Sequence, residues 1–389
     1  MKVPLLDLKA QYADIREDIR TAIEEVCETQ CFILGPKVEA FESHIAEYCG
    51  TEYAVGVSSG TDALLVALMA LDVGQGDAVI TTPYTFFSTA GSIVRLGATP
   101  VFVDIDPVTY NIDPEKARKT LKSMPKRFKN LKPKVMMPVH LYGQMADMDP
   151  LFDLSKEYGL KVVEDAAQSI GAEYISKRGT FRAGSMGDIG CFSFFPSKNL
   201  GGFGDGGIVT TSNSQIAEKI RKLRNHGAKP KYYHGLVGGN FRLDAIQAAI
   251  LDIKLTRLEL WHEARRTNAG RYDKALEGSD ICSPKAVYKD SGVTNYHIFN
   301  QYVVRVAKRD EVLERLKAAE IGCEVYYPLP LHLQECFRDL GYKEGNLPES
   351  EKAARETLAL PVYPELTSQM QDYVVRTLLA CFSHQLDSR

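Results

Sequence analysis

Short apolar runs alternate with amphipathic segments between residues 50 and 210 of this 389-residue chain. The apolar runs predict strands at 54–57, 78–81, 99–103, 133–140, 159–164, 189–194 and 207–211. The segments between them predict helices at 61–71, 85–96 and 148–158. Strands that alternate with helices favour parallel β-α-β units, which bind ligands at the carboxyl ends of the strands.

The pattern changes after residue 211. A helix is predicted at 213–225, and the stretch 241–277 is almost unbroken helical sequence, long enough to bridge two domains. The remaining segments predict strands at 301–306 and 323–326 and helices at 310–319, 349–358 and 368–381. We therefore expect an N-terminal arm with a large α/β domain at 1–255, and a smaller C-terminal α+β domain at 256–389.

Composition indicates an ordinary soluble protein. The chain is 44% apolar and 25% charged, and its net charge of −3 does not indicate a polyanionic partner. Eight cysteines without a C-x-x-C pair are typical of reduced thiols in a cytoplasmic protein. The first residues lack the apolar core of a signal peptide, and no apolar run approaches the ~20 residues that span a bilayer. We expect a cytoplasmic protein that binds neither nucleic acid nor membrane.

One lysine stands in an unusual setting. Lys198 lies in the stretch 192–207, between an aromatic strand and a loop that carries five glycines. Burying a strongly hydrated ammonium group is costly, and partly apolar surroundings lower the pKa of a lysine. The resulting free amine is what Schiff-base chemistry requires. An exposed lysine in a turn is the alternative, and three upstream features argue against it.

Two segments predict a site for a phosphate group. Residues 58–62 join a strand to a helix, with serines at the cap and a glycine at the start of the helix. A helix N-terminus offers free N–H groups and the positive end of a dipole to a phosphate. The hydroxyl of Ser193, five residues before Lys198, can complete such a site. A simple capped helix and an ordinary strand serine are the alternative interpretations.

Three further features suit a flat ring that contains nitrogen. Asp165 follows an apolar run, so its carboxylate is expected at the end of a strand, where it can keep a pyridine nitrogen protonated. Gln168 lies three residues further on and can form a hydrogen bond with a ring oxygen. An aromatic residue of the segment 83–89, at a strand-to-helix junction, can stack on the ring. The alternatives are a helix N-cap for Asp165 and core packing for the aromatics.

Together these features match the requirements of pyridoxal phosphate (PLP): a phosphate cradle, a stacking ring, an anionic partner for a ring nitrogen, and a lysine. A nicotinamide or flavin site does not need all four. The glycines at 202, 204 and 207 form a G-x-G-x-x-G, but a strand follows them, whereas a dinucleotide site requires a helix. The chain has no P-loop motif and no His/Cys spacing typical of a metal site. We therefore expect PLP and no metal.

Six motifs, in order along nearly the whole chain, are similar to those of a known family. They lie at residues 33–36, 59–63, 164–169, 192–199, 240–244 and 326–332. With them the sequence resembles the nucleotide-sugar aminotransferases of the DegT/DnrJ/StrS type, which are PLP enzymes with the fold of aspartate aminotransferase. The resemblance implies fold type I, with a large α/β domain around a mainly parallel sheet and a smaller C-terminal α+β domain.

The resemblance also implies roles for individual residues. Lys198 would hold PLP in a Schiff base and move the proton between the substrate carbon and the cofactor, and Asp165 would pair with the pyridine nitrogen. The other cofactor contacts would be Gln168 to the ring oxygen, Phe86 as the stacking aromatic, Gly60, Thr61 and Ser193 to the phosphate, and Asn240 to the phosphate from the neighbouring subunit of a homodimer. Arg242, Tyr327 and His332 lie where the family contacts the nucleotide-sugar.

The activity implied is transfer of an amino group, with L-glutamate as donor by family analogy, to a UDP- or dTDP-linked 3-keto or 4-keto sugar. The reaction would be ping-pong and would serve amino-sugar and surface-polysaccharide biosynthesis. Tyr326 stands where many relatives have histidine, which leaves the contacts to sugar or diphosphate open. A sister group with histidine in place of the lysine catalyses deoxygenation, and Lys198 argues against that. Another fold-type-I PLP enzyme acting on amino acids and a non-catalytic PLP-fold regulator are the alternatives.

Overall fold

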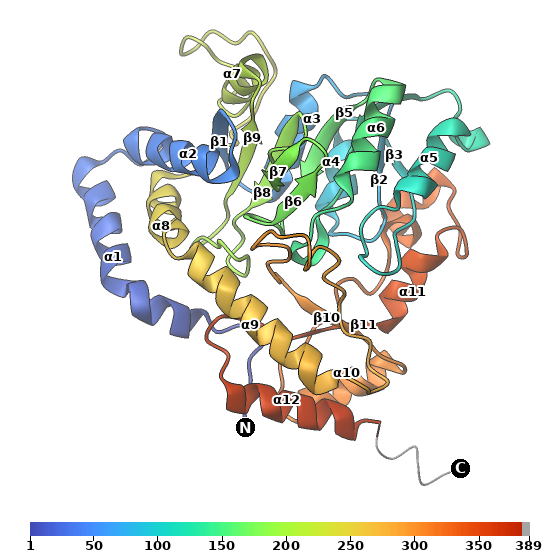
Figure 1. The fold of residues 1–389 in the computed structure, drawn as a ribbon. Helices are drawn as coiled ribbons and strands as arrows, with labels where there is room; N and C mark the ends of the chain where they lie inside the picture. The colour runs from blue at the N-terminus through green and yellow to red at the C-terminus, as the bar shows by residue number, and fades with distance from the viewer. Residues whose placement is uncertain (383–389) are drawn as a thin grey trace.

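The centre of the molecule is a seven-stranded sheet in the order β1-β9-β8-β5-β4-β2-β3 (Figure 1). The computed structural model describes residues 1–382. The strands are β1 (Tyr53–Val57), β2 (Asp77–Thr81), β3 (Thr99–Phe102), β4 (Lys132–Met136), β5 (Lys161–Asp165), β8 (Ile189–Ser193) and β9 (Gly207–Thr211). Neighbours from β8 across to β3 pair in parallel, whereas β9 is antiparallel to both β1 and β8. The predicted α/β class with a mainly parallel sheet is confirmed.

Helices cover both faces of this sheet because its strands are apolar on both sides. The covering helices are α2 (Pro36–Cys49), α3 (Gly60–Ala70), α4 (Ser88–Arg95), α5 (Pro114–Lys122), α6 (Met148–Tyr158), α7 (Ser214–Leu223) and α8 (Ala245–Leu255). In β2, Ile80 packs in the core shared with α2, α6 and α8, and its neighbour Val79 packs in the core shared with α3, α4 and α7. Side chains alternate along a strand, so a continuous apolar run supplies both cores at once.

A smaller core forms below the sheet from the C-terminal part of the chain (Figure 1). Its elements are α9 (Leu258–Leu276), β10 (Tyr302–Arg305), α10 (Arg309–Ala318), β11 (Thr357–Leu360) and α12 (Ser368–Ala380). Helix α11 (Pro348–Glu356) instead packs through Ala353 and Ala354 against Tyr84 and Tyr142. The N-terminal end joins the smaller core: Val3 is buried in this core, and its N–H donates to the carbonyl of Glu320 at 3.0 Å. Helix α1 (Leu8–Thr29) then packs along α8. The division of the chain at residue 255 stays a prediction.

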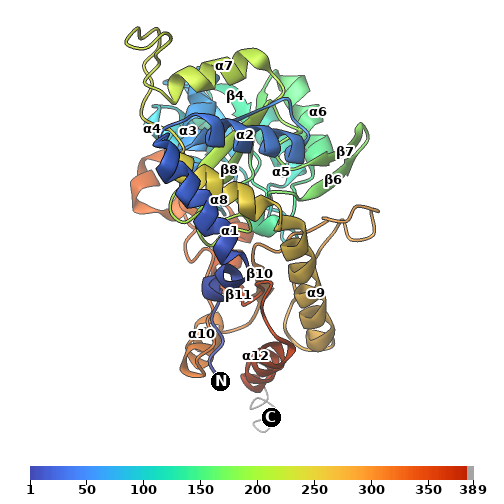
Figure 2. The ribbon, with the colours of Figure 1, turned by 90° about the vertical axis from the view of Figure 1, so that its left-hand side faces the viewer.

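Two of the expected elements are wrong. The continuous helix expected at 241–277 is two helices, because α8 ends at Leu255 and α9 begins at Leu258. The break allows α8 to pack under the sheet while α9 turns toward α12 (Figure 2). The strand expected at 323–326 is reduced to an isolated bridge between Glu324 and Ala359. A hairpin of β6 (Glu173–Ser176) and β7 (Gly179–Arg182) was not expected from the sequence.

Three general features bear on function. No helix within residues 1–382 is both long enough and apolar enough to cross a bilayer. Within the same residues, no three His, Cys, Asp or Glu side chains gather into a group able to hold a metal ion. All eight cysteines are free thiols.

Candidate active site

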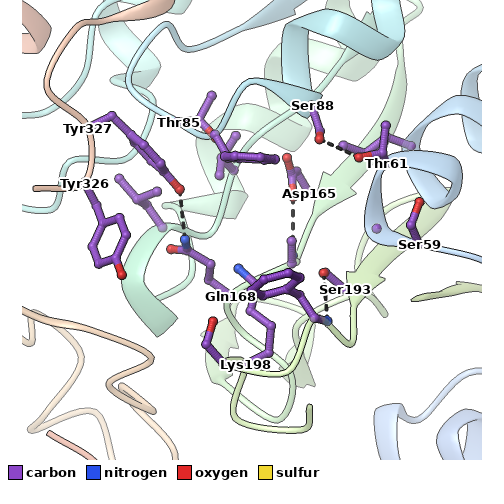
Figure 3. Close-up of a pocket in the computed structure, with 18 of the residues that line it drawn as sticks. Ser59, Thr61, Thr85, Ser88, Asp165, Gln168, Ser193, Lys198, Tyr326 and Tyr327 are labelled. Atoms are coloured by element: carbon purple, nitrogen blue, oxygen red, sulfur yellow. Dashed lines mark hydrogen bonds between the residues drawn. The ribbon is translucent and has the colours of Figure 1, made fainter. Parts of the chain in front are cut away.

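A cavity of about 470 Å³ opens at the carboxyl ends of the parallel strands (Figure 3). Asp165, the last residue of β5, and Ser193, the last residue of β8, both line it. The segments that precede α3 and α4 add further walls, and Tyr326 and Tyr327 close the cavity from the C-terminal part. The cavity therefore lies where α/β sheets bind ligands, and its volume is that of a small-molecule site.

The start of α3 forms one end of the cavity. Ser59 caps the helix, because its Oγ accepts a hydrogen bond of 3.1 Å from the backbone N–H of Asp62. The first amides of a helix have no intrahelical partner, so Gly60 and Thr61 bring N–H groups to the cavity wall, beside the Ser193 hydroxyl. Gly60 is packed so tightly that a Cβ there would lie 2.5 Å from the Cβ of Ser193. Free amides, hydroxyls and a close backbone approach together suit a phosphate group.

Asp165 is only 4% exposed, and two donors hold its carboxylate. Its Oδ2 accepts a hydrogen bond of 2.7 Å from the Thr89 hydroxyl, and its Oδ1 accepts one of 3.3 Å from the backbone N–H of Ala167. Burial raises the pKa of Asp165, whereas these two hydrogen bonds and the nearby charge of Lys198 oppose that rise. A buried carboxylate in such surroundings is a suitable partner for a cationic ring nitrogen.

Lys198 lies in the loop after β8, and its side chain lines the cavity (Figure 3). Its backbone N–H donates to the carbonyl of Phe195 at 2.8 Å, which turns the chain at this point. Burial lowers the pKa of Lys198 to about 8, and the negative charge of Asp165 offsets part of the effect. Part of the amine is therefore neutral, and nucleophilic, near neutral pH.

Gln168, Tyr327 and Phe86 line the same cavity. The Gln168 amide accepts a hydrogen bond of 2.7 Å from the backbone N–H of Tyr142 at Oε1, and its Nε2 donates to the Tyr327 hydroxyl at 3.2 Å (Figure 3). Burial raises the pKa of Tyr327, so its hydroxyl keeps its proton. Phe86 is 58% exposed, with its ring centre 6.2 Å from that of Tyr327. An exposed ring at the wall of a cavity offers a face for stacking on a flat ligand.

Two buried tyrosines hold the segment that carries Tyr326 and Tyr327. The hydroxyls of Tyr84 and Tyr142 both donate to the backbone carbonyl of Tyr326, the first at 2.8 Å. The Tyr84 hydroxyl also lies 2.7 Å from the hydroxyl of Thr357. Tyr84 and Tyr142 follow strands of the large sheet, so these hydrogen bonds fix the C-terminal wall of the cavity to that sheet.

Three residues predicted for the site lie outside the cavity wall. Asn240 is exposed and forms an isolated bridge with Asn225. Arg242 donates to the side-chain oxygen of Asn225 at 2.8 Å. His332 is buried, with its Nε2 3.0 Å from a carboxylate oxygen of Glu351. The roles expected of these three stay predictions, and that of Asn240 concerns a neighbouring subunit, which a single chain does not contain.

Sequence reasoning missed several polar residues at this site. Thr85, Ser88 and Thr89 lie in the segment 83–89, which was selected for its aromatic residues. Their hydroxyl groups were not considered. The Ser88 hydroxyl lies 2.6 Å from that of Thr61. Helical spacing does not mark Thr85 and Thr89 as a pair, because Thr85 lies before α4 begins at Ser88. Gln301 also lines the cavity, and no local pattern marks it, because only the fold brings it there.

Comparisons with known proteins agree with this geometry. Residues 13–379 match the model of the DegT/DnrJ/EryC1/StrS aminotransferase family. The chain is 49% identical over 387 residues to the pleiotropic regulatory protein of Geobacillus stearothermophilus, covering 99% of this chain and 100% of that one. It is 41% identical over 367 residues to the UDP-N-acetyl-3-dehydro-alpha-D-glucosamine 3-aminotransferase of Acidithiobacillus ferrooxidans, covering 94% of each. The structure of DesV from S. venezuelae in complex with a ketimine intermediate matches with a TM-score of 0.90 and 38% identity, over 98% of each chain.

Proposed function

The chain belongs to the DegT/DnrJ/EryC1/StrS aminotransferase family, and we propose that it transfers an amino group from L-glutamate to a nucleotide-linked 3-keto sugar. Its fold is that of the PLP-dependent sugar aminotransferases, and it is itself a PLP-dependent transaminase. Several of its relatives are named as nucleotide-sugar aminotransferases. The names of relatives that act on UDP- or dTDP-linked 3-amino sugars support the choice of C3.

One observation carries the proposal: a single cavity joins Lys198, with its lowered pKa, to the buried carboxylate of Asp165 and to the open start of α3. These are the parts that PLP needs, namely an amine, an anionic partner for the ring nitrogen and a cradle for the phosphate. The residues present therefore fit this cofactor. Bound PLP supplies an electron sink, which accepts the charge that develops when a bond at the substrate carbon breaks.

In this proposal Lys198 and Asp165 carry the chemistry. Lys198 would hold the cofactor through its Nζ. When free, the same Nζ would take a proton from the substrate carbon and pass it on. A pKa of about 8 suits an acid and base that works near neutral pH, where such proton transfer contributes a factor of about 10²–10⁴ in rate. Asp165 would keep a proton on the ring nitrogen, a role that its burial and its two hydrogen-bond donors support.

The other cavity residues would orient the ligands and exclude water. Gly60, Thr61 and Ser193 would hold the phosphate at the start of α3. Gln168 would contact the ring oxygen, and Phe86 would cover one face of the ring. No proton transfer is needed from these residues, so their contribution is position, which raises the rate by holding the reacting atoms in line.

We also propose a homodimer whose two active sites are shared between the subunits. Asn240 is exposed in each chain and lies outside that chain's cavity, so a contact with a phosphate would have to be made in the other subunit. The adjoining loop exposes Tyr232 (78%) and Tyr233 (72%), as expected of a surface that meets another chain. Arg242 and His332 keep their proposed contacts with the nucleotide-sugar on family likeness alone.

The test is a half-reaction with the PLP-loaded protein. We expect L-glutamate and a UDP- or dTDP-linked 3-amino sugar each to convert the cofactor to its pyridoxamine form, seen as loss of the visible absorption band. The matching 4-amino sugar nucleotides should convert it slowly or not at all. The Lys198→Ala variant should lack both the band and the reaction, because no other lysine lines the cavity formed by residues 1–382.

Two other results would contradict the proposal. Conversion by amino acids alone would indicate an amino-acid enzyme of the same fold. A protein that holds PLP but reacts with no amine would indicate a regulatory role, which the name of the Geobacillus stearothermophilus relative gives to that protein.

A further inference from the structure

Two threonine hydroxyls lie in line behind the carboxylate of Asp165. The Oγ1 of Thr85 lies 2.9 Å from that of Thr89, and the Oγ1 of Thr89 lies 2.7 Å from Oδ2 of Asp165. Thr89 is fully buried, and Thr85 is 3% exposed and lines the cavity (Figure 3). Thr89 lies in the first turn of α4, and Thr85 lies in the bend that precedes this helix.

The chemistry of the three groups fixes the direction of the hydrogen bonds. An ionised carboxylate only accepts hydrogen bonds, so Thr89 must donate its single hydroxyl proton to Asp165. Thr89 then has only lone pairs left, so Thr85 must donate to Thr89. The order Thr85 to Thr89 to Asp165 therefore holds as long as the carboxylate is charged. If Asp165 took up a proton on Oδ2, this order of hydrogen-bond donors and acceptors would be lost.

We propose that Thr89, supported by Thr85, is a positioning residue for the cofactor: it orients the Asp165 carboxylate and keeps it ionised for the ring nitrogen of PLP. The inference rests on the proposed role of Asp165. Without the hydroxyl, the main direct donor left to the carboxylate would be the backbone N–H of Ala167, at a long 3.3 Å. A buried carboxylate with so little support favours its neutral form, which attracts a protonated ring nitrogen less strongly.

The electrostatic surroundings of Asp165 support this role. Burial raises its pKa, and the hydrogen bond from Thr89 is the largest of the influences that lower it. The other influences that lower it are the Ala167 amide and the electrostatic effects of Lys198 and His140. Tyr327 and Cys191 also face this carboxylate, and burial keeps both of them protonated and neutral.

The test compares two cofactors in the full-length protein. Thr89→Val removes the hydroxyl while keeping the shape of the side chain. We expect it to weaken PLP binding about 10- to 100-fold, the usual effect of losing a hydrogen bond to a charged group. We expect little change, less than about twofold, for the 1-deaza analogue of PLP, which has carbon in place of the ring nitrogen and so has no proton to share with Asp165. Thr89→Ser should restore most of the PLP affinity.

Two further variants separate this role from simple packing. Thr85→Val should weaken PLP binding in the same direction but less, because it leaves the bond from Thr89 to Asp165 intact. Thr81→Val is the matched control. Like Thr89, Thr81 is a fully buried threonine, but its hydroxyl donates to the backbone carbonyl of Met137 at 2.9 Å and not to Asp165. It should change the affinity for neither cofactor.

Two results for the Thr89→Val variant would overturn the inference. If Thr89→Val weakened the two cofactors equally, Thr89 would act through packing and not through the ring nitrogen. If it weakened neither, the hydroxyl would have no role in holding the cofactor. Failure of the unaltered protein to bind PLP is a different result, and it would contradict the proposed function itself.

Discussion

The reactivity of Lys198 should depend on pH in a way that the structure defines. Burial lowers its pKa from 10.5 to about 8. At pH 7 this raises the neutral fraction of the amine from about 0.03% to about 9%, roughly 300-fold. The neutral amine is the form that attacks an aldehyde. Protein freed of PLP should therefore bind it covalently at a rate that rises through a midpoint near pH 8 and is level above about pH 9.

The same reasoning predicts the effect of a neighbouring charge. The carboxylate of Asp165 stabilises the charged form of Lys198 and so raises its pKa against the effect of burial. Asp165→Asn removes that charge and keeps the shape of the side chain. The midpoint for covalent binding should therefore move to lower pH in this variant, although the cofactor itself is held less firmly. A midpoint that moved upward would contradict the electrostatic account.

The assay is rapid mixing of the PLP-free protein with PLP, followed by absorbance and then by trapping with borohydride. Lys254 provides an internal control, because burial lowers its pKa to about 8 as well. Its Nζ donates to the carbonyl of Gly201, and it does not line the cavity. Peptide mapping should therefore find the trapped cofactor at Lys198 and not at Lys254. A midpoint above about pH 10, the range of an ordinary lysine, would refute the reasoning.

Two further predictions concern the phosphate cradle and the subunit arrangement. Gly60→Ala puts a Cβ 2.5 Å from that of Ser193, so we expect weaker PLP binding in titrations and a loss of about 1–3 kcal/mol in the free energy of unfolding. Gly270→Ala, which meets no atom within 4 Å, is the control, and wild-type affinity in the Gly60 variant would refute the close approach. If the sites are shared, a refolded mixture of Lys198→Ala and Asn240→Ala chains should regain activity that neither has alone, because each hybrid dimer holds one intact site. A mixture that stays inactive would contradict sharing.

Much of the fold was open to prediction because its signals are local. The apolar runs of the central strands bury both faces, and the alternation of strands and helices predicts a parallel sheet. The break between α8 and α9 was missed because no proline or glycine marks Thr256 or Arg257. The chain turns there because each helix packs on a different core, which is a property of the assembled molecule. The place of Val3 in the C-terminal core was missed for the same reason.

The residues of the candidate site also fall into two groups, those found from local sequence and those that only the fold brings to the site. Lys198, Asp165 and Gln168 were found from residues beside them in the chain, and the structure brings all three to one cavity. Asn240 was also found from its motif. In the role proposed for it, the phosphate that it contacts is bound in another subunit. Residues without a motif, such as Gln301, were found only after the chain was folded.

Local sequence was enough to identify the chemical groups and the strand ends that carry them, since a strand, a helix cap and a glycine-rich turn depend on neighbouring residues. The way in which those groups act on each other depends on the folded molecule. Thr89 meets Asp165 across 76 positions, and Tyr84 meets the carbonyl of Tyr326 across 242. Contacts between such distant segments follow from the packing of whole elements. Burial, which lowers the pKa of Lys198 and raises that of Asp165, exists only once those elements have closed around the cavity.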